Sequence, residues 1–420
     1  MSPNEATNNM AAYKFWKTQP VPKFDGKDDI QQGPIKIIDP DETPKDPYPL
    51  LDGFEWVTLD LTEDNNVVEL YNLLSTHYVE DGEGEFRLNY SPAFLRWALT
   101  SPGWQKEWHV GVRASKSKKL TAFISGVPTK IRAHDQTVQV VEINFLCIHK
   151  KLRSKRLAPL LIKEITRRCY LKGIYQAVYT AAVVLPTPIA SYRYFHRPLN
   201  WLKLYEAGFA FLPLNSTTGR QVAKYHLPRN TSIPGLRALR ESDLDALQHL
   251  LEQYLARFDV SPKFTKDEIR HWLFHEEKKG VEQVVWSYVV EDAQTQKLTD
   301  FFSFYSLESS VTSHSKHDKI RTAYLYYYAS AFSSTEDGLE ARLEILINDA
   351  LIVAKKADFD VFNALNLQDN ALFLEKLRFM NGSGELNYYL FNYRMPPVRD
   401  AQEKNLPLMG RRGGVGIVLV

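Results

Sequence analysis

The segment that could do chemistry combines an apolar strand with a strongly basic loop. The apolar run at 140–148 is typical of a buried strand, and Lys150-Lys-Leu-Arg-Ser-Lys-Arg156 follows almost at once. From His149 to Arg168 the chain has eight Lys or Arg residues and one Glu. A strand, a loop and a helix in this order gather backbone amides, a positive helix-dipole end and cations around one point. The segment therefore predicts a site for an anion such as a pyrophosphate.

A helix is expected after this loop, because 160–168 is amphipathic. Ser154 and Pro159 suit its start, since Ser accepts from free amides and Pro lacks a donor that would be unpaired there. The chain has no glycine-rich GxxxxGK[ST] loop here, which argues against a nucleoside triphosphatase. The alternative is a solvated charged loop before a surface helix. The apolar strand directly before the loop favours the anion site.

Composition sets the broad class of the protein. The chain has 420 residues, 44% of them hydrophobic and 12% aromatic, which is enough for two cores. A net charge of +2 gives no indication of nucleic-acid binding. Cys147 and Cys169 are too few for a disulfide framework and indicate reduced thiols. We find neither a secretory signal nor an apolar run of roughly 18 residues, and expect a cytoplasmic monomer without stable membrane insertion.

The sequence repeats itself after an arm at 1–50 that is rich in Pro, Asp, Lys and Gln. Trp108-His-Val-Gly-Val returns as Trp286-Ser-Tyr-Val-Val, 178 residues later. Four further segments return with the same element order: 54–80 as 236–260, 143–147 as 324–328, 156–168 as 342–355, and 175–181 as 359–365. This near-constant offset predicts a duplicated α+β unit. The loop of the second copy, at 331–341, is acidic and would repel phosphate, so we expect only the first half to bind a nucleotide.

The residues of the basic segment resemble a known family. Glu142-Ile-Asn-Phe-Leu-Cys-Ile-His-Lys150, with Leu152-Arg-Ser-Lys-Arg-Leu157 behind it, is similar to the first signature of the glycylpeptide N-tetradecanoyltransferases, or N-myristoyltransferases. The resemblance continues over nearly the whole chain, through Tyr13–Pro22, Tyr78–Asp81, Tyr179–Ala182, Tyr192–Asn200, Asp300–Tyr305 and Asp360–Leu365. Two positions depart from the pattern. Arg378-Phe-Met-Asn-Gly-Ser-Gly384 replaces the usual Lys-Phe-Gly-x-Gly-Asp-Gly, and Ala182 stands where glycine is common.

The resemblance implies an architecture. The order strand, helix, hairpin, strand, pyrophosphate loop, helix, strand resembles the GCN5-related acyltransferase fold. We expect an α+β protein in which two tandem units of this kind form one saddle-shaped sheet with pseudo-twofold symmetry and flanking helices. The expected divisions are an arm with a cofactor clamp at 1–50, an acyl-CoA-binding unit at 51–228 and a peptide-binding unit at 229–420.

The resemblance also implies a reaction: transfer of a myristoyl group from myristoyl-CoA to the N-terminal glycine amine of proteins. The backbone amides of Phe145 and Leu146 would stabilise the oxyanion, and the α-carboxylate of Val420 would accept the proton of the amine. From the residues alone, Phe145 and Leu146 could equally be ordinary strand residues. The apolar tail at 411–420 could thread into the core or complete a sheet as a terminal strand.

Binding residues follow from the same matches. The acyl-CoA site is expected at Tyr13, Lys14, Phe15, Trp16, Phe145, Leu146, Cys147, Ile148, Arg153, Ser154, Lys155, Arg156, Leu157 and Ala158. The peptide site is expected at Tyr78, Phe86, Leu88, Tyr90, Asn144, Thr180, Tyr194, His196, Tyr327 and Leu419.

Other chemistries find less support in the sequence. A thiolate mechanism at Cys147 is disfavoured, because a strand Cys between apolar neighbours should be buried. His149 lies beside cations that disfavour its charged form, so it is not expected to act as a base. No His or Cys pattern with metal-ligand spacing and no Gly-x-Ser-x-Gly motif occurs. Two other functions stay open: a short-chain N-acyltransferase of the same superfamily, and a non-catalytic acyl-CoA-binding module.

Overall fold

One large sheet forms the centre of the molecule in the computed structural model, which describes residues 10–24, 31–80, 82, 84–277, 279–312, 316–332, 336–399 and 413–420. Within these residues, fourteen strands join in this sheet, and twelve of them follow the order β1-β3-β4-β5-β6-β14-β7-β13-β12-β11-β10-β8. The first half supplies β1 (Phe54–Thr58), β2 (Phe86–Asn89), β3 (His109–Ala114), β4 (Leu120–Ala133), β5 (Gln136–Ile148), β6 (Ala177–Ala181) and β7 (Ala190–Pro198). The second half supplies β8 (Leu236–Ala238), β9 (Val260–Pro262), β10 (Val285–Glu291), β11 (Leu298–Val311), β12 (Lys319–Ser330), β13 (Val361–Leu365) and β14 (Met380–Phe391).

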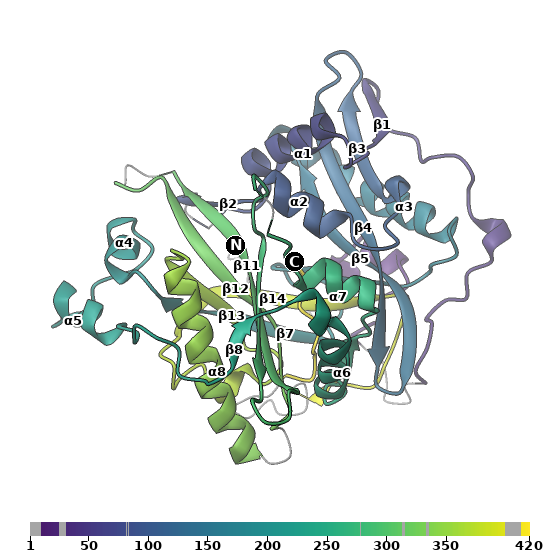
Figure 1. The fold of residues 1–420 in the computed structure, drawn as a ribbon. Coiled ribbons are helices and arrows are strands. Elements are labelled where there is room, and N and C mark those ends of the chain that lie inside the picture. The colour runs from purple at the N-terminus through teal and green to yellow at the C-terminus, as the bar shows by residue number, and fades with distance from the viewer. Residues whose placement is uncertain are drawn as a thin grey trace.

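The helices flank this sheet on both faces (Figure 1). They are α1 (Asp64–His77), α2 (Pro92–Leu99), α3 (Leu157–Tyr170), α4 (Trp201–Glu206), α5 (Thr218–Lys224), α6 (Leu244–Leu255), α7 (Lys266–Leu273) and α8 (Glu336–Lys356). Side chains along β4 alternate between the two faces of the sheet and show which helix covers which face. Ala122 and Ile124 pack in the hydrophobic cluster that contains α3, whereas Phe123 packs in the cluster that contains α1. The 3-10 turns are η1 (Met10–Ala12), η2 (Trp16–Thr18), η3 (Pro40–Glu42), η4 (Lys106–Trp108), η5 (Lys150–Lys155), η6 (Glu241–Asp243) and η7 (Asn370–Leu372).

The predicted duplication is confirmed by the strand order. The series β3-β4-β5-α3-β6 of the first half returns as β10-β11-β12-α8-β13 in the second half, and the sheet reads almost as a palindrome about its centre. The acidic loop expected at 331–341 lies partly outside the described residues, and α8 begins at Glu336 within it. The sequence repeat therefore encodes an architectural repeat of two α+β units.

The two halves exchange their last strands. Strand β14, from the second half, pairs antiparallel with β6 of the first half. Strand β7, from the first half, pairs antiparallel with β13 of the second half. The strands β7 and β14 pair with each other in the middle of the sheet. Because each half completes the other's sheet, the interface between the halves is made of backbone hydrogen bonds as well as side-chain packing.

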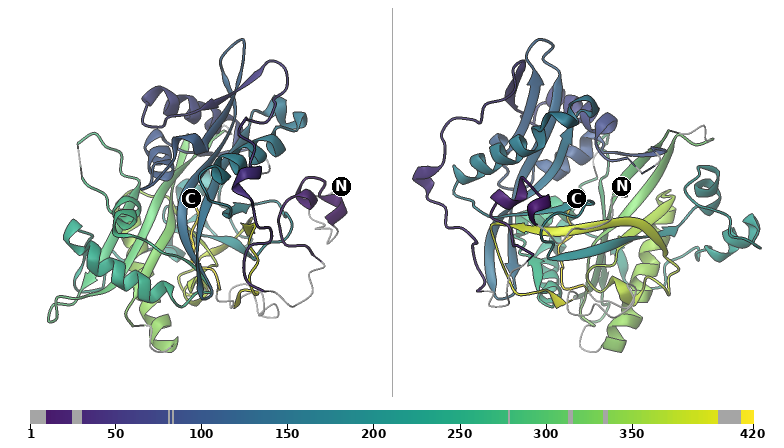
Figure 2. Two further views of the ribbon diagram at one scale, coloured as in Figure 1. Left: turned by 90° about the vertical axis from the view of Figure 1, so that its right-hand side faces the viewer. Right: turned by 180° about the vertical axis from the view of Figure 1, so that it is seen from behind.

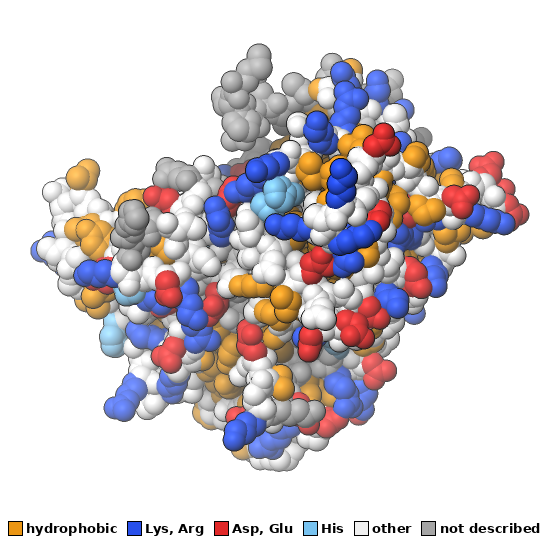
Figure 3. Space-filling view, turned by 90° about the horizontal axis from the view of Figure 1, so that it is seen from above, with side chains coloured by type: hydrophobic (Ala, Val, Ile, Leu, Met, Phe, Trp, Pro, Cys, Tyr) orange, Lys and Arg blue, Asp and Glu red, His pale blue; other side chains and the backbone are white. Residues whose placement is uncertain are grey.

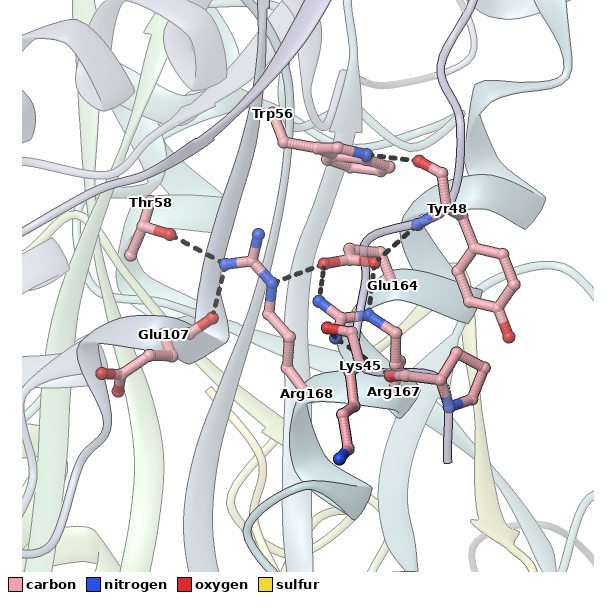
Figure 4. A network of polar contacts seen from close by, with 9 residues as sticks. Lys45, Tyr48, Trp56, Thr58, Glu107, Glu164, Arg167 and Arg168 are labelled. Atoms are coloured by element: carbon pink, nitrogen blue, oxygen red, sulfur yellow. Dashed lines mark hydrogen bonds and ion pairs between the residues drawn. The ribbon is translucent and has the colours of Figure 1, made fainter. Parts of the chain in front are cut away.

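A buried carboxylate on α3 fixes the N-terminal arm (Figure 4). Glu164, which is fully buried, accepts hydrogen bonds from Arg167 and Arg168 and from the Tyr48 backbone amide. Arg167 also donates to the backbone carbonyls of Pro44 and Lys45. A buried charge with several donors is costly to disrupt by removing one partner. This network holds the arm against the outer face of α3.

The C-terminal segment threads into the core, which is one of the two arrangements expected for the apolar tail. Val415, Ile417 and Leu419 are buried, and the chain ends in the middle of the molecule in each view (Figures 1 and 2). Glycines in this segment allow it to pack closely against its neighbours. A Cβ on Gly413 would lie 2.5 Å from the Gln368 amide nitrogen, and one on Gly416 would lie 2.7 Å from the Phe258 ring. An isolated bridge between Val260 and Val415 relates this segment to the sheet, and the Tyr192 and Tyr327 hydroxyls accept hydrogen bonds from the amides of Val415 and Val418.

Candidate active site

Strand β5 carries a bulge at the predicted oxyanion residues. Cys147 pairs with Phe123 and Asn144 pairs with Ser125, so Phe145 and Leu146 lie together opposite the single residue Ile124. Phe145 has a left-handed φ of 55°, which is rare for a side chain of this size. The bulge turns the backbone of these two residues out of the regular ladder. The reading of Phe145 and Leu146 as ordinary strand residues therefore does not fit the structure.

The neighbouring strands diverge at the same level. The parallel pairing of β5 with β6 stops at Ile143 and Tyr179, and β6 continues in pairing with β14 alone. A cavity of about 630 Å³ opens in this gap. Asn144, Phe145 and Leu146 line it from β5, and Thr180 and Ala181 line it from β6. The cavity thus contacts the part of the sheet where the bulge turns the backbone of Phe145 and Leu146 out of the ladder.

This cavity is apolar at one end and polar at the other. The apolar end lies between the sheet and α3 and is lined by Ile124, Val141, Ile143, Ile162, Ile165, Cys169, Ile174 and Phe391. The polar end lies between the two halves of the protein and is lined by Tyr194, His196, Tyr324, Asn363 and Glu385. The bulge and the last residue, Val420, lie on the cavity wall as well. A long hydrocarbon and a polar chain could therefore meet in one continuous space.

The chain's last residue lies beside a buried acid that sequence reasoning missed. The Glu142 carboxylate accepts a hydrogen bond from the Asn144 side chain at 2.6 Å and another from the backbone amide of Val420. Burial raises the pKa of Glu142 to about 7, and these two hydrogen bonds oppose the shift. Val418, two residues before Val420, is held by the Tyr327 hydroxyl, which accepts from its amide at 3.0 Å. Together these contacts fix the C-terminal carboxylate at the cavity.

The bulge amide and an aromatic hydroxyl are also in contact. The backbone amide of Phe145 donates to the Tyr78 hydroxyl, and the Tyr78 ring packs on the Phe145 ring with centroids 5.8 Å apart. Burial raises the pKa of Tyr78 well above its usual value, so this hydroxyl stays neutral. A ligand oxygen at the bulge would compete with the Tyr78 hydroxyl for the amide. Tyr78 therefore lines the cavity beside the bulge.

The basic loop differs from the sequence prediction in one respect. Ser154 was expected near a helix start as a capping residue, but it lies within the 3-10 turn η5. The N-cap of α3 is instead Arg156, in a left-handed conformation with φ of 58° and without a side-chain cap bond. Its side chain and those of Arg153, Ser154 and Lys155 are exposed. Uncapped amides at the start of α3 remain available to an anion.

Two histidines join this cationic surface. The His77 and His149 rings lie 4.0 Å apart between centroids, and Arg153 donates to the His77 backbone carbonyl. Desolvation, followed by the charges of His149 and Lys150, lowers the pKa of His77 to about 4. His149 likewise has its pKa lowered, first by desolvation and then by nearby lysines. The upper face of the molecule shows Lys and Arg side chains gathered beside histidine (Figure 3), as an anion site requires.

One histidine at the polar end has a defined tautomer. The His196 ring and the Asn363 side-chain oxygen are 2.7 Å apart, so Nδ1 carries the proton and Nε2 is left to accept. Desolvation lowers the pKa of His196, which keeps the ring neutral. Gly382 passes directly over this ring, where a Cβ would lie 2.4 Å from Nε2. The Arg378–Gly384 segment departs from the family pattern but keeps a glycine at position 382. The contact with His196 leaves no room there for a side chain.

The structure gathers most of the expected peptide-site residues at the cavity but not all of them. Of the peptide residues, Tyr78, Leu88, Tyr90, Asn144, Thr180, Tyr194, His196 and Leu419 line it. Phe86 instead packs on Phe209, and Tyr327 is a core residue that holds the C-terminal segment. Cys147 points to the α1 side, and burial raises its pKa to about 12, which argues against a thiolate. Of the clamp residues, Trp16 reaches the cavity and stacks on Tyr179 at 5.8 Å.

The sequence did not identify the α3 residues that line the apolar end of the cavity. Ile162, Ile165, Thr166 and Cys169 line it from α3. Their helical spacing was visible in the sequence and indicated only a face buried against a sheet. Among the described residues, no group of three or more His, Cys, Asp or Glu side chains could hold a metal ion.

The fold and the site together define an acyl-CoA-dependent acyltransferase: a bulged strand beside a diverging one, a basic loop at a helix start, and an apolar cavity leading to the bulge. Family models agree. The N-terminal domain model of myristoyl-CoA:protein N-myristoyltransferase matches residues 34–192, and the C-terminal domain model matches residues 206–418. The chain therefore belongs to the N-myristoyltransferase family.

Individual relatives cover almost the whole chain. The glycylpeptide N-tetradecanoyltransferase of Aspergillus fumigatus is 61% identical over 98% of this chain and 84% of its own length. The enzyme of the same name from Schizosaccharomyces pombe is 51% identical over 97% and 89%. A crystal structure of Saccharomyces cerevisiae N-myristoyltransferase with bound myristoyl-CoA superposes with a TM-score of 0.93 at 45% identity, covering 97% of this chain and 94% of that one. None of the helices in the described ranges is both long and apolar enough to span a bilayer.

Proposed function

We infer that this protein transfers a myristoyl group from myristoyl-CoA to the N-terminal glycine amine of protein substrates. The observation that carries this inference is the continuous cavity of about 630 Å³, which joins an apolar end, the bulge at Phe145 and Leu146, and a polar groove. The relatives' names supply the acyl group and the acceptor. The apolar end favours a long acyl chain over the short-chain alternative, because burying each methylene is worth about 0.8 kcal/mol.

The acyl donor is proposed to lie along α3. Its phosphates would contact the loop from Arg153 to Ala158, where exposed cations and uncapped amides of α3 can bind anions. The acyl chain would follow the apolar end of the cavity towards Tyr170 and Phe391. Trp16, stacked on Tyr179, would cover the chain from the N-terminal arm. The remaining clamp residues Tyr13, Lys14 and Phe15 stay predictions for the nucleotide part.

The reaction is proposed to be a direct attack. The glycine nitrogen forms a bond to the thioester carbon, the amides of Phe145 and Leu146 stabilise the oxyanion, and the carbon–sulfur bond breaks to release coenzyme A. A glycine ammonium has a pKa of about 8 and must lose one proton before the attack and a second afterwards, which the departing thiolate takes up to leave as the coenzyme A thiol. The Val420 carboxylate, held beside the bulge, is the proposed acceptor for the first. One donor to an oxyanion is typically worth about 3 kcal/mol.

The acceptor peptide is proposed to lie in the groove between the halves. Asn144, Thr180 and His196 offer polar contacts there, while Tyr78 and Tyr90 form an aromatic floor with ring centroids 5.6 Å apart. The space beside the bulge is proposed to suit a first residue without a Cβ. An added methyl would displace the attacking amine, and a small displacement can cost about 100-fold in rate. We further propose that the protein acts in the cytoplasm as a monomer. Its independence from nucleic acid also stays a prediction.

A thiol-release assay tests this function. Myristoyl-CoA and peptides that start with Gly or Ala are mixed with the protein, and free coenzyme A is measured. We expect release with the Gly peptide and at least about tenfold slower release with the Ala peptide. An acetyl-CoA arm separates a short-chain transferase from a long-chain one. Binding of myristoyl-CoA without peptide-dependent release would identify a non-catalytic module instead.

A further inference from the structure

A second cavity lies behind the apolar end of the first one. It has a volume of about 480 Å³ and lies between the N-terminal arm and the outer face of α3. Thr166, Tyr170 and Phe391 line both cavities, so these three side chains form the wall between them. The second cavity contains none of the residues assigned above to the acyl-CoA loop or to the peptide groove. A cavity of this volume is large enough for a small ligand.

The charge of this second cavity is predominantly positive. Four lysines line it: Lys17, Lys23 and Lys36 from the N-terminal arm, and Lys163 from α3. In the described part of the chain, no carboxylate lies within ion-pair distance of any of these four amino groups. Lys163 instead lies over the Tyr48 ring, 5.9 Å from its centroid. A local excess of positive charge favours an anionic ligand.

The other charged groups around the cavity leave this excess in place. Asp39 and Glu42 also line it, but Asp39 accepts from the Asp41 backbone amide at 2.9 Å as the cap of η3. Arg167 lines the cavity as well and is committed to the buried Glu164 in the network of Figure 4. The lysines therefore outnumber the carboxylates, and the arginine is already neutralised.

Thr43 also lines the second cavity, but it is only 7% exposed and its Oγ1 is closed off from solvent, so this hydroxyl does not face the open space of the cavity. Recognition of an anion therefore rests on the lysines, whose ammonium groups can donate to phosphate oxygens.

We propose that this second cavity binds a small anion that carries several phosphate groups, at a site separate from that of acyl-CoA. Four lysines contributed by the arm and by α3 match a polyphosphate better than a single phosphate. Tyr170 and Phe391 would contact the bound anion on one side and the acyl tail on the other. Binding at one of the two sites is therefore expected to affect binding at the other. The anion could be a soluble polyphosphate or the headgroup of a phosphorylated lipid, which present the same chemistry.

The test uses the full chain saturated with myristoyl-CoA, so that the loop at 153–158 is occupied. Inorganic tripolyphosphate is titrated calorimetrically into this complex. We expect one binding event, weakened at least about tenfold by Lys36→Glu combined with Lys163→Glu, since charge reversal replaces attraction by repulsion. Lys116→Glu, on an exposed lysine outside the cavity, is the matched control and should leave the affinity unchanged.

Each outcome decides for or against the site. Absence of binding to the parent, or equal affinity in the double variant, overturns the proposal. A double variant that loses myristoyl-CoA to the same extent assigns the cavity to acyl-CoA and also overturns it. Cosedimentation with phosphatidylcholine vesicles that contain phosphatidylinositol bisphosphate, lost in the double variant, assigns the lipid source, whereas binding of tripolyphosphate alone assigns a soluble ligand. Thermal unfolding of every variant shows whether a loss of binding comes from misfolding. The titration measures binding only, so it can be interpreted even if the transferase assay fails.

Discussion

The backbone amide of Val420 donates a hydrogen bond to the carboxylate of Glu142, so the last residue of the chain is fixed to the strand that carries the bulge. Glu142 lies three residues before Phe145 on β5, and both Val420 and Phe145 line the same cavity. Through this contact, the strand that supplies the proposed oxyanion donors also holds the residue whose α-carboxylate is the proposed proton acceptor. It also makes the end of the chain a position where small changes should have large effects on turnover.

Extending the chain after Val420 tests the proposed acceptor. Two added serines replace the α-carboxylate by an amide and move the negative charge away, so kcat should fall at least about 100-fold. Affinity for myristoyl-CoA should stay within a few-fold, because its proposed contacts lie on α3 and the basic loop. Stopped-flow turnover and calorimetric titration measure the two quantities. Parental turnover of the extended enzyme would remove the carboxylate from the mechanism.

The basic loop can be tested by charge reversal. Lys155→Glu places a negative charge at the start of α3, where the structure leaves cations exposed. We expect myristoyl-CoA affinity to fall by at least about tenfold, since a single charge–phosphate contact is typically worth more than 1 kcal/mol. Lys116→Glu serves again as the control. Equal affinities of Lys155→Glu and parent in a calorimetric titration would contradict the assigned phosphate site.

The titration of Glu142 should appear in the pH dependence of stability. Its pKa of about 7 in the folded protein exceeds the ordinary value of 4.5, so the folded state binds more protons between these pH values. The free energy of unfolding contributed by this group should therefore decrease as pH rises from about 4.5 to about 7, by ~3 kcal/mol at most. Glu142→Gln should remove this slope and be more stable than the parent at pH 8. Chemical denaturation at several pH values measures it.

A matched control keeps that measurement specific. Glu252→Gln changes an exposed carboxyl on α6 and should leave the slope in place. A Glu142→Gln variant whose stability follows the parental pH profile would show that Glu142 titrates in its ordinary range.

The wall between the two cavities should set the length of the acyl chain. Tyr170→Ala removes a ring from the far end of the apolar cavity and makes room for additional methylenes. Two methylenes are worth roughly 1.6 kcal/mol, so kcat/KM for a C16 donor should rise about tenfold relative to a C14 donor. Competition between the two donors gives the ratio directly. An unchanged ratio would place the end of the acyl chain elsewhere, and Tyr205→Ala, on the distant helix α4, is the control.

Local patterns predicted a large part of this fold. Apolar alternation, helical spacing and charge placed the strand, the basic loop and the helix at 140–170, and the structure has β5, η5 and α3 there. The constant offset between repeats predicted two α+β units, and the sheet order confirms them. The apolar end of the chain predicted a buried tail. The boundary near residue 228 stays a prediction, and the exchange of β7 and β14 has no sequence signal of its own.

The sequence by itself determined which elements form, which loop attracts an anion and which family the residues resemble, because these depend on neighbours within a few positions along the chain. Tertiary structure alone decided where those elements meet. The contact of Glu142 with Val420 joins residues almost 280 positions apart, and the wall of Tyr170 and Phe391 joins a helix of the first half with the last strand of the second. Burial, and with it the raised pKa of Glu142, depends on the groups packed around a carboxyl in space, which spacing along a sequence does not encode.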